Sequence, residues 1–394
     1  MNHNIPTLLL PTLAISLFSV PLGALMAFIM VISTPSIYNS QMCRYTLYLI
    51  MALALSYINL TKPIHSSDLG YYYWLYNLVE EKSFVEYMAL IPKEPLYHLY
   101  NYILHMFTFG YFNAFMVVHT TICYMLVFST YDIVVRNTEV DIKYALVAAA
   151  IFLLFIEFFF YTAQIVRQVV AGSVAIYGIA KNTYEKNKYS IWLIGLAGFI
   201  HASAFFFMLY YVIYFFRHLQ FRKLFLLIIS FLVCYKLLLG LLGNIFDDAS
   251  TIGIAIRRGI SGSNEFVSIG ILPLLVCVVI LPMSVIIIRK TDNLSEKLFF
   301  IFPIALIVFI LMNIDSPLFV LRFMEYTYMF IPLALVLYLA HTVRSFPLIP
   351  FTVILIFMLA RFSIKLGTSD FSYISIFDYL SVGIPHYIFK IFNI

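Results

Sequence analysis

The chain has 394 residues, of which 63% are hydrophobic and only 11% are charged. Soluble globular domains contain about 25% charged residues, so this composition excludes an ordinary soluble protein. The formal net charge is +5. Most Lys and Arg lie in short loops between apolar segments, so positive-inside bias accounts for this charge and no nucleic-acid partner is expected.

Apolar stretches of roughly 20 residues, the length that crosses a bilayer as a helix, recur along the chain. They lie near residues 12–32, 45–60, 112–131, 144–162, 224–245, 267–288, 298–313, 322–343 and 347–363. Two further stretches, 94–109 and 189–216, are harder to assign. We therefore expect one domain over residues 1–394: an all-α, polytopic integral membrane bundle of about 10–12 transmembrane helices in the lipid bilayer. The 4 cysteines lack metal-ligand spacing and are read as small membrane hydrophobes.

Four basic loops predict the orientation. The segments 136–143, 181–188, 217–223 and 289–297 are the basic loops and are expected in the cytoplasm. This places 61–94, 247–266, 314–321 and the C-terminal tail on the outer side. Both flanks of 189–216 are basic, so either this stretch breaks into two half-crossings near "GFIHASAF" or one flank is misassigned. We favour the broken segment.

The outer loop 61–94 has the sequence of a structured lid. "SSDLGYYYWLYNLV" offers serine caps and then helical spacing from Asp68 onward. "SFVE", from Ser83 to Glu86, is a capping box that predicts a second short helix. Prolines on both sides of Glu94 end that helix. Two capped helices over the membrane predict a platform that positions a substrate.

Arg167, in "AQIVRQVVAGSVA", is the first candidate for function at membrane depth. Ionisable residues there cost about 2.5–3.5 kcal/mol on insertion scales, which makes each a functional candidate. Arg167 shares its helical face with Ala163 and Ala171, so it is expected to point into the bundle, with Gln168 beside it. The alternative is an interfacial arginine that extends to the outer surface.

His201, in "GFIHASAF", is the second candidate. Its neighbours at helical spacing are mostly small, and the expected helix break lies close to it. The alternative is a packed core histidine that hydrogen-bonds a backbone carbonyl.

Three more arginines lie toward the outer side. Arg322 comes early in "DSPLFVLRFMEYTYMF" and shares a face with Glu325 and Tyr326. This arginine could bind a phosphate, or it could form a structural pair with the glutamate. Arg257 and Arg258, in the glycine-rich outer loop, suit an anion clamp, although adjacent loop arginines are more often solvated.

Together these residues predict two kinds of chemistry at the outer face. Arginines at membrane depth suit an anionic lipid headgroup. Aromatic rings beside carboxylates suit sugars, because rings offer flat faces and carboxylates accept hydroxyl hydrogen bonds. The candidates for the sugar surface are Tyr71, Tyr72 and Trp74.

The order of these motifs resembles the EpsG-like, Wzy-type polysaccharide polymerase family. The matching residues are Asp68 with Tyr71 and Tyr72, Glu94-Pro95-Leu96-Tyr97, Arg167-Gln168, His201-Ala202-Ser203-Ala204, and Arg322 with Tyr326. The resemblance implies a glycosyltransferase class C-like membrane enzyme of the bacterial inner membrane with a periplasmic active site. It would join undecaprenyl-diphosphate-linked oligosaccharide repeat units into O-antigen or capsular polysaccharide or exopolysaccharide. It also implies a chain-length regulator as a candidate partner protein, and no cofactor or metal.

Roles for the candidates follow from this reaction. Arg167 and Arg322 would stabilise the departing diphosphate, with Arg257 or Arg258 assisting and Gln168 and Tyr326 in the binding site. His201 is the first choice of general base, and Asp68 or Glu94 is the alternative. Tyr71, Tyr72 and Trp74 would bind sugar.

Three other functions remain open from the sequence. A flippase for lipid-linked oligosaccharides would spread charge through the full membrane depth, whereas here charge gathers toward one side. An O-acyltransferase would use an intramembrane histidine, but it would take its acyl donor from the cytoplasm. A ligase that transfers the finished glycan to lipid A is chemically closest to the polymerase.

Overall fold

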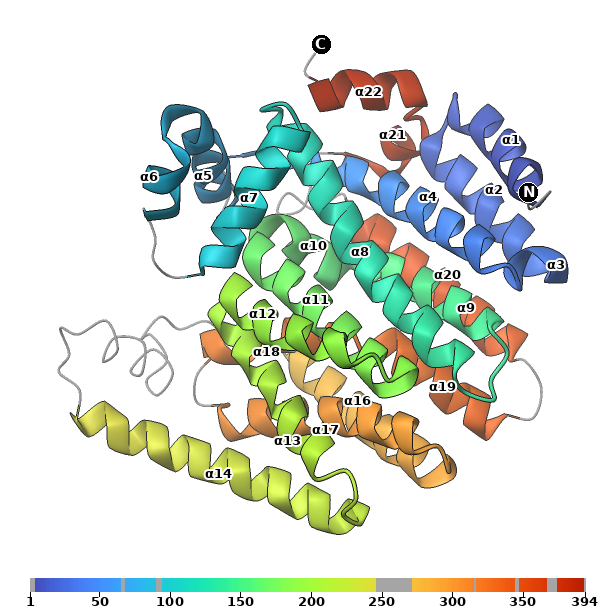
Figure 1. Cartoon of the computed structure of the whole chain (residues 1–394). Helices are drawn as coiled ribbons and strands as arrows, with labels where there is room; N and C mark the ends of the chain where they lie inside the picture. Colours follow the sequence, from blue (N-terminus) through green and yellow to red (C-terminus); the bar gives the residue numbers. More distant parts are fainter. Residues whose placement is uncertain are drawn as a thin grey trace. The chain divides into compact units, whose positions relative to one another are not determined.

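The computed structural model describes residues 4–64, 68–89, 94–245, 271–314, 317–343, 347–366 and 374–392. These residues are helical throughout, with turns between helices and no strand in the ranges described (Figure 1). The all-α membrane bundle expected from the sequence is confirmed. The helices form two compact units, one of Met1–Phe205 with Ser345–Ile394 and one of Phe206–Arg344. The expectation of a single domain over 1–394 stays a prediction.

In the first unit, the long helix α8 (Phe112–Arg136) packs against α4 (Gln41–Asn59), α9 (Lys143–Leu153) and α11 (Val166–Glu185). The other helices of this unit are α1 (Asn4–Ser16), α2 (Val20–Ser33), α3 (Pro35–Tyr38), α5 (Leu69–Glu81), α6 (Phe84–Ala89), α7 (Pro95–Phe107), α10 (Ile156–Gln164), α12 (Ile191–Ile200), α20 (Leu348–Leu366), α21 (Ile376–Leu380) and α22 (Ile384–Phe392). Aromatic rings fill the core between α8 and its neighbours; Tyr124 of α8, for example, lies 5.4 Å from Phe152 of α9 and 5.5 Å from Phe158 of α10 between ring centroids. Helix α11, which carries Arg167, packs along this same helix α8.

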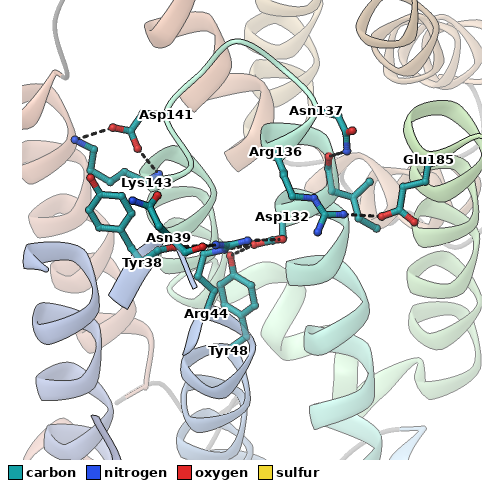
Figure 2. Close-up of polar contacts among 11 residues, drawn as sticks. Tyr38, Asn39, Arg44, Tyr48, Asp132, Arg136, Asn137, Asp141, Lys143 and Glu185 are labelled. Atoms are coloured by element: carbon teal, nitrogen blue, oxygen red, sulfur yellow. Dashed lines mark hydrogen bonds and ion pairs between the residues drawn. The ribbon is translucent and has the colours of Figure 1, made fainter. Parts of the chain in front are cut away.

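A buried ion pair joins α4 to α8 (Figure 2). Arg44 Nε lies 2.5 Å from Asp132 Oδ1, and Nη2 lies 3.1 Å from Oδ2. Arg44 Nη1 donates to the backbone carbonyls of Tyr38 and Asn39, and the Tyr48 hydroxyl donates to Asp132 at 3.4 Å. The arginine therefore binds the end of α3 and the last turn of α8 at once. The pair was not predicted from the sequence, although the lone Asp132 in the apolar run "STYDIVV" is a signal for it.

The second unit is arranged around α17 (Leu294–Met312). Helix α17 packs against α14 (Phe221–Ile245), α16 (Ile271–Lys290), α18 (Pro317–Tyr328) and the short α13 (Leu209–Phe215), and α19 (Ile331–Thr342) packs on α16. At one end of α17, the buried Glu296 accepts hydrogen bonds from Thr291 at 2.6 Å and from His341 at 2.7 Å. This network links the start of α17 to the end of α19.

By length and composition, 3 helices among the described residues could cross a membrane, or 5 if two bent pairs each count as one span. The three are α8, α17 and α20, and the bent pairs are α9 with α10 and α18 with α19. Several expected spans are divided into shorter helices. In the stretch 12–32, for example, Ser19 caps α2 through the Leu22 amide at 3.2 Å, and a proline follows in the first turn. The polytopic bundle is confirmed, and the number of crossings stays a prediction.

Candidate functional site

The loop 61–94 forms the two short helices expected of it, α5 and α6. The capping box at α6 is present: the Ser83 amide donates to Glu86 Oε2 at 2.9 Å, and the Glu86 amide donates to Ser83 Oγ at 3.4 Å. Asp68 is the N-cap residue of α5, although its side chain makes no capping hydrogen bond. The serines expected to cap α5 lie outside the described residues.

Glu94 anchors the far end of this loop. It precedes Pro95, the first residue of α7, and has a left-handed backbone with φ of 64°. This conformation is unfavourable for a residue with a side chain, and contacts of the carboxylate hold it in place. Glu94 Oε2 accepts from Arg167 Nη1 at 2.5 Å, and Oε1 accepts from the Ala202 amide at 3.1 Å. The outer loop is thus attached both to the start of α11 and to the segment after α12.

His201 lies in a helix break within "GFIHASAF", and the two half-crossings that the basic flanks favour there stay a prediction. Helix α12 ends at Ile200, His201 is extended (φ −150°, ψ 129°), and a 3-10 helix, Ala202–Met208, follows. Nδ1 lies 2.7 Å from Ser203 Oγ and accepts from the Ser203 amide at 3.3 Å. Nε2 lies 3.6 Å from Glu94 Oε1. A backbone donor at Nδ1 favours the tautomer with its proton on Nε2, directed toward the carboxylate.

Aromatic rings surround Arg167. Its guanidinium carbon lies 5.6 Å from the ring centroids of Tyr71 and Tyr72 and 5.8 Å from that of Tyr97, which is the geometry of cation–π contacts. Nε also donates to the Tyr72 hydroxyl at 3.4 Å. Burial raises the pKa of Tyr72, and the positive charge of Arg167 partly offsets this shift. The Tyr72 hydroxyl is therefore protonated and neutral at physiological pH.

The aromatic surface continues outward from Arg167. Tyr71 is 37% exposed and Trp74 is 50% exposed, and their ring centroids lie 5.9 Å apart. Two exposed rings beside a half-buried cation can receive a ligand that is apolar on its faces and anionic at one end. Tyr97 was not among the residues assigned to binding, although it lies one turn after Glu94 in the "EPLY" motif.

Two other candidates lie near this cluster. Asp68 is exposed at the start of α5 and interacts electrostatically with Tyr72 and with the buried Lys62. Burial lowers the pKa of Lys62 to about 8, and the Asp68 charge opposes this shift. Asp68 thus adjoins the aromatic part of the cluster. Gln168 is buried in α11, next to Arg167.

The candidates near the C-terminal end of the motif series, Arg322 and Tyr326, lie in the second unit. Arg322 is exposed on α18, within electrostatic reach of the buried Glu325. Tyr326 is fully buried, with its ring 4.9 Å from that of Phe207. Arg322 and Arg167 belong to different units, and their joint action stays a prediction. Arg257 and Arg258 lie outside the described residues.

The cluster of Glu94, Arg167, His201, Tyr71, Tyr72, Trp74 and Tyr97 is termed the outer cluster below. It brings a cation, a carboxylate, an imidazole and exposed aromatic rings together within one unit. In the parts of the chain that the structure describes, no group of three or more His, Cys, Asp or Glu side chains is placed to hold a metal ion.

No curated protein and no solved structure matches the chain. A model of the EpsG family matches residues 45–381, a range that contains the whole outer cluster. EpsG-like families are associated with Wzy-type polymerases, which indicates a polymerase-like role in membrane polysaccharide synthesis. The chain belongs to the EpsG family.

Proposed function

We propose that the protein polymerises undecaprenyl-diphosphate-linked oligosaccharide repeat units into O-antigen or capsular polysaccharide or exopolysaccharide at the periplasmic face of the inner membrane. The observation that carries this proposal is the chain of contacts from Arg167 through Glu94 to His201, with the exposed rings of Tyr71 and Trp74 beside it. A lipid-linked glycan has the matching parts: a diphosphate, sugar rings and a hydroxyl that loses a proton.

In the proposed reaction, a hydroxyl oxygen of the incoming repeat unit attacks the anomeric carbon at the reducing end of the growing chain. The bond from that carbon to the diphosphate oxygen breaks, and undecaprenyl diphosphate leaves with the electron pair. Arg167 stabilises the negative charge that develops on the leaving group. Arginine has five N–H donors, so its bonds to Glu94 and Tyr72 leave capacity for phosphate oxygens.

The hydroxyl proton goes to His201. Nδ1 would receive it, either directly or through the Ser203 hydroxyl 2.7 Å away. The imidazolium that forms would then donate through Nε2 toward Glu94, whose carboxylate stabilises the added positive charge. Glu94 is thus a positioning residue in this reaction, and Glu94 or Asp68 is the alternative base. The reaction as proposed needs no metal, so EDTA is expected to leave the rate unchanged.

The test is incubation of the purified protein with its lipid-linked repeat unit, followed by separation of the products by size. A ladder of products is expected. A single transfer to another acceptor lipid would identify a ligase instead. Substrate that shows no covalent change would indicate a transporter instead.

A further inference from the structure

A row of buried polar atoms lies on α7, one turn beyond Glu94. Tyr97, His98 and Asn101 are each 0% exposed. The Tyr97 hydroxyl, both ring nitrogens of His98 and Asn101 Oδ1 have no hydrogen-bond partner among the residues that the structure describes. More than nine-tenths of buried polar groups have a partner, and those that do not often mark a place where water or a ligand binds. The mechanism above uses none of these atoms.

His98 and Asn101 contact Tyr87 of α6, and the Tyr97 ring lies beside that of His98. Tyr97 and Asn101 are one helical turn apart, and His98 lies on the same side of α7 as Asn101. Asn101 Nδ2 donates to the Tyr87 hydroxyl at 2.6 Å. The His98 ring centroid lies 5.5 Å from that of Tyr87 and 5.9 Å from that of Tyr97.

The row is neutral and offers both donors and acceptors. A neutral imidazole such as that of His98 has one N–H donor and one acceptor nitrogen, and the Tyr97 hydroxyl both donates and accepts. Asn101 adds a carbonyl acceptor. A sugar matches this set, since each hydroxyl both donates and accepts and the ring faces pack on aromatic side chains.

The row adjoins the proposed phosphate site. The Tyr97 ring centroid lies 5.8 Å from the Arg167 guanidinium carbon, so the ring and the arginine are in direct cation–π contact. We infer that Tyr97, His98 and Asn101 form a subsite for the sugar directly attached to the diphosphate and select its hydroxyl configuration. This inference rests on the proposed function. A site that hydrogen-bonds a particular hydroxyl rejects sugars that lack this hydroxyl, because the buried polar groups of the site are then left without hydrogen-bond partners.

The Tyr87 hydroxyl occupies the same side of α7. A sugar hydroxyl that bonds to Asn101 would replace the bond from Asn101 to Tyr87. If water alone occupies the row, its groups have a structural role and their removal leaves glycan binding unchanged.

The experiment compares two tyrosine-to-phenylalanine variants. The probe is the oligosaccharide repeat released from its lipid by mild acid, and its binding to the purified protein is measured by saturation-transfer NMR. Tyr97→Phe removes one hydroxyl from the row and is expected to weaken binding about tenfold, the effect of one hydrogen bond. Tyr124→Phe is the matched control. The Tyr124 hydroxyl is equally buried and also without a partner among the described residues, but its ring is 5.4 Å from Phe152 in the α8 core. This control is expected to bind as the wild type does.

Two further variants and the polymerisation assay separate the outcomes. His98→Gln and Asn101→Leu are expected to raise KM for the lipid-linked repeat about tenfold while kcat changes less than threefold. Suppose that the wild-type protein polymerises and that Tyr97→Phe binds the oligosaccharide within twofold of wild type. This result would overturn the subsite and leave the proposed function standing. A wild-type protein that neither binds the oligosaccharide nor polymerises would overturn both.

Discussion

The charged residues of the outer cluster are neutralised by one another and by aromatic rings. Arg167 has 23% of its side chain exposed and Glu94 has 10%, so both are largely removed from water. A cation in this setting is stabilised by the carboxylate and by the ring faces of three tyrosines. A phosphate that replaces or joins the carboxylate meets an arginine that is already oriented.

The first prediction concerns this arginine. Arg167→Lys should lower polymerisation about 100-fold, because an ammonium lacks the planar donor fork and a single lost donor to a developing charge costs about that much. Gel separation of polymer lengths measures the effect. Arg361→Lys is the control, since Arg361 also pairs with a glutamate, Glu157, in the same unit. Wild-type chain lengths in Arg167→Lys would contradict the phosphate assignment.

The second prediction separates the candidate bases. His201→Ala should lower kcat at least about 100-fold, the usual contribution of a general base, and leave binding of the lipid-linked unit intact. His105→Ala, on α7, is the control. If His201→Ala remains active while Glu94→Gln or Asp68→Asn is inactive, the base is a carboxylate and His201 is a packed histidine.

The third prediction concerns Lys62 and pH. Its pKa is lowered from 10.5 to about 8 by burial, so between these values the unfolded chain binds more protons than the folded one. The free energy of unfolding should therefore rise by about 3 kcal/mol as pH increases from 8 to 10.5, and the cost of the buried charge should be fully present below pH 8. Lys62→Met should raise the Tm at pH 7 and remove this rise. Lys82→Met, at an exposed lysine, is the control and should neither raise the Tm nor remove the rise with pH. If the free energy of unfolding still rises with pH in Lys62→Met, another group causes the rise.

At the scale of elements, the helix ends position the candidate site. The end of α12 at His201 exposes the Ala202 amide, which donates to Glu94. The start of α7 places Glu94 at the N-cap. In a continuous helix the Ala202 amide would bond to a carbonyl of the same helix. Because the helix ends here, the amide is available to the site. The motifs "EPLY" and "HASA" therefore mark the end of one element and the start of another.

The fourth prediction concerns the pair that joins α4 to α8. Asp132→Asn leaves the Arg44 guanidinium, 3% exposed, without its counter-charge, and should lower the free energy of unfolding by about 3–5 kcal/mol. Thermal unfolding in detergent measures the change. The double variant Arg44→Met, Asp132→Leu should recover most of the loss, because it removes both buried charges. Equal Tm values for Asp132→Asn and wild type would show that the pair is not needed for stability.

At the scale of the whole molecule, the fifth prediction concerns orientation. Basic loops place 61–94 outside and 289–297 inside. In a variant without native cysteines, an impermeant thiol reagent added to intact spheroplasts should label Lys82→Cys and should not label Asp292→Cys. Both positions are exposed on the protein surface. Labelling of Asp292→Cys alone would reverse the orientation and move the outer cluster to the cytoplasmic side.

The sequence by itself determined the features that depend on local chemistry. Composition and apolar length predicted the helical membrane bundle, the Ser83–Glu86 spacing predicted the cap of α6, and the two basic flanks predicted a broken segment near His201, where a helix ends. Each follows from a few consecutive residues, because capping bonds and bilayer insertion act within a turn or a single helix.

Only the tertiary structure decided which of these residues contact one another. Glu94 and Arg167 are 73 positions apart, and Arg44 and Asp132 are 88 apart. Hydrophobic periodicity could not predict either pair, because in a membrane the faces toward lipid and toward protein are both apolar. It also could not show that the Glu94 carboxylate lies between Arg167 and His201. The packing of α7, α11 and α12 decides that, since a hydrogen bond forms only where the backbone brings donor and acceptor within about 3 Å.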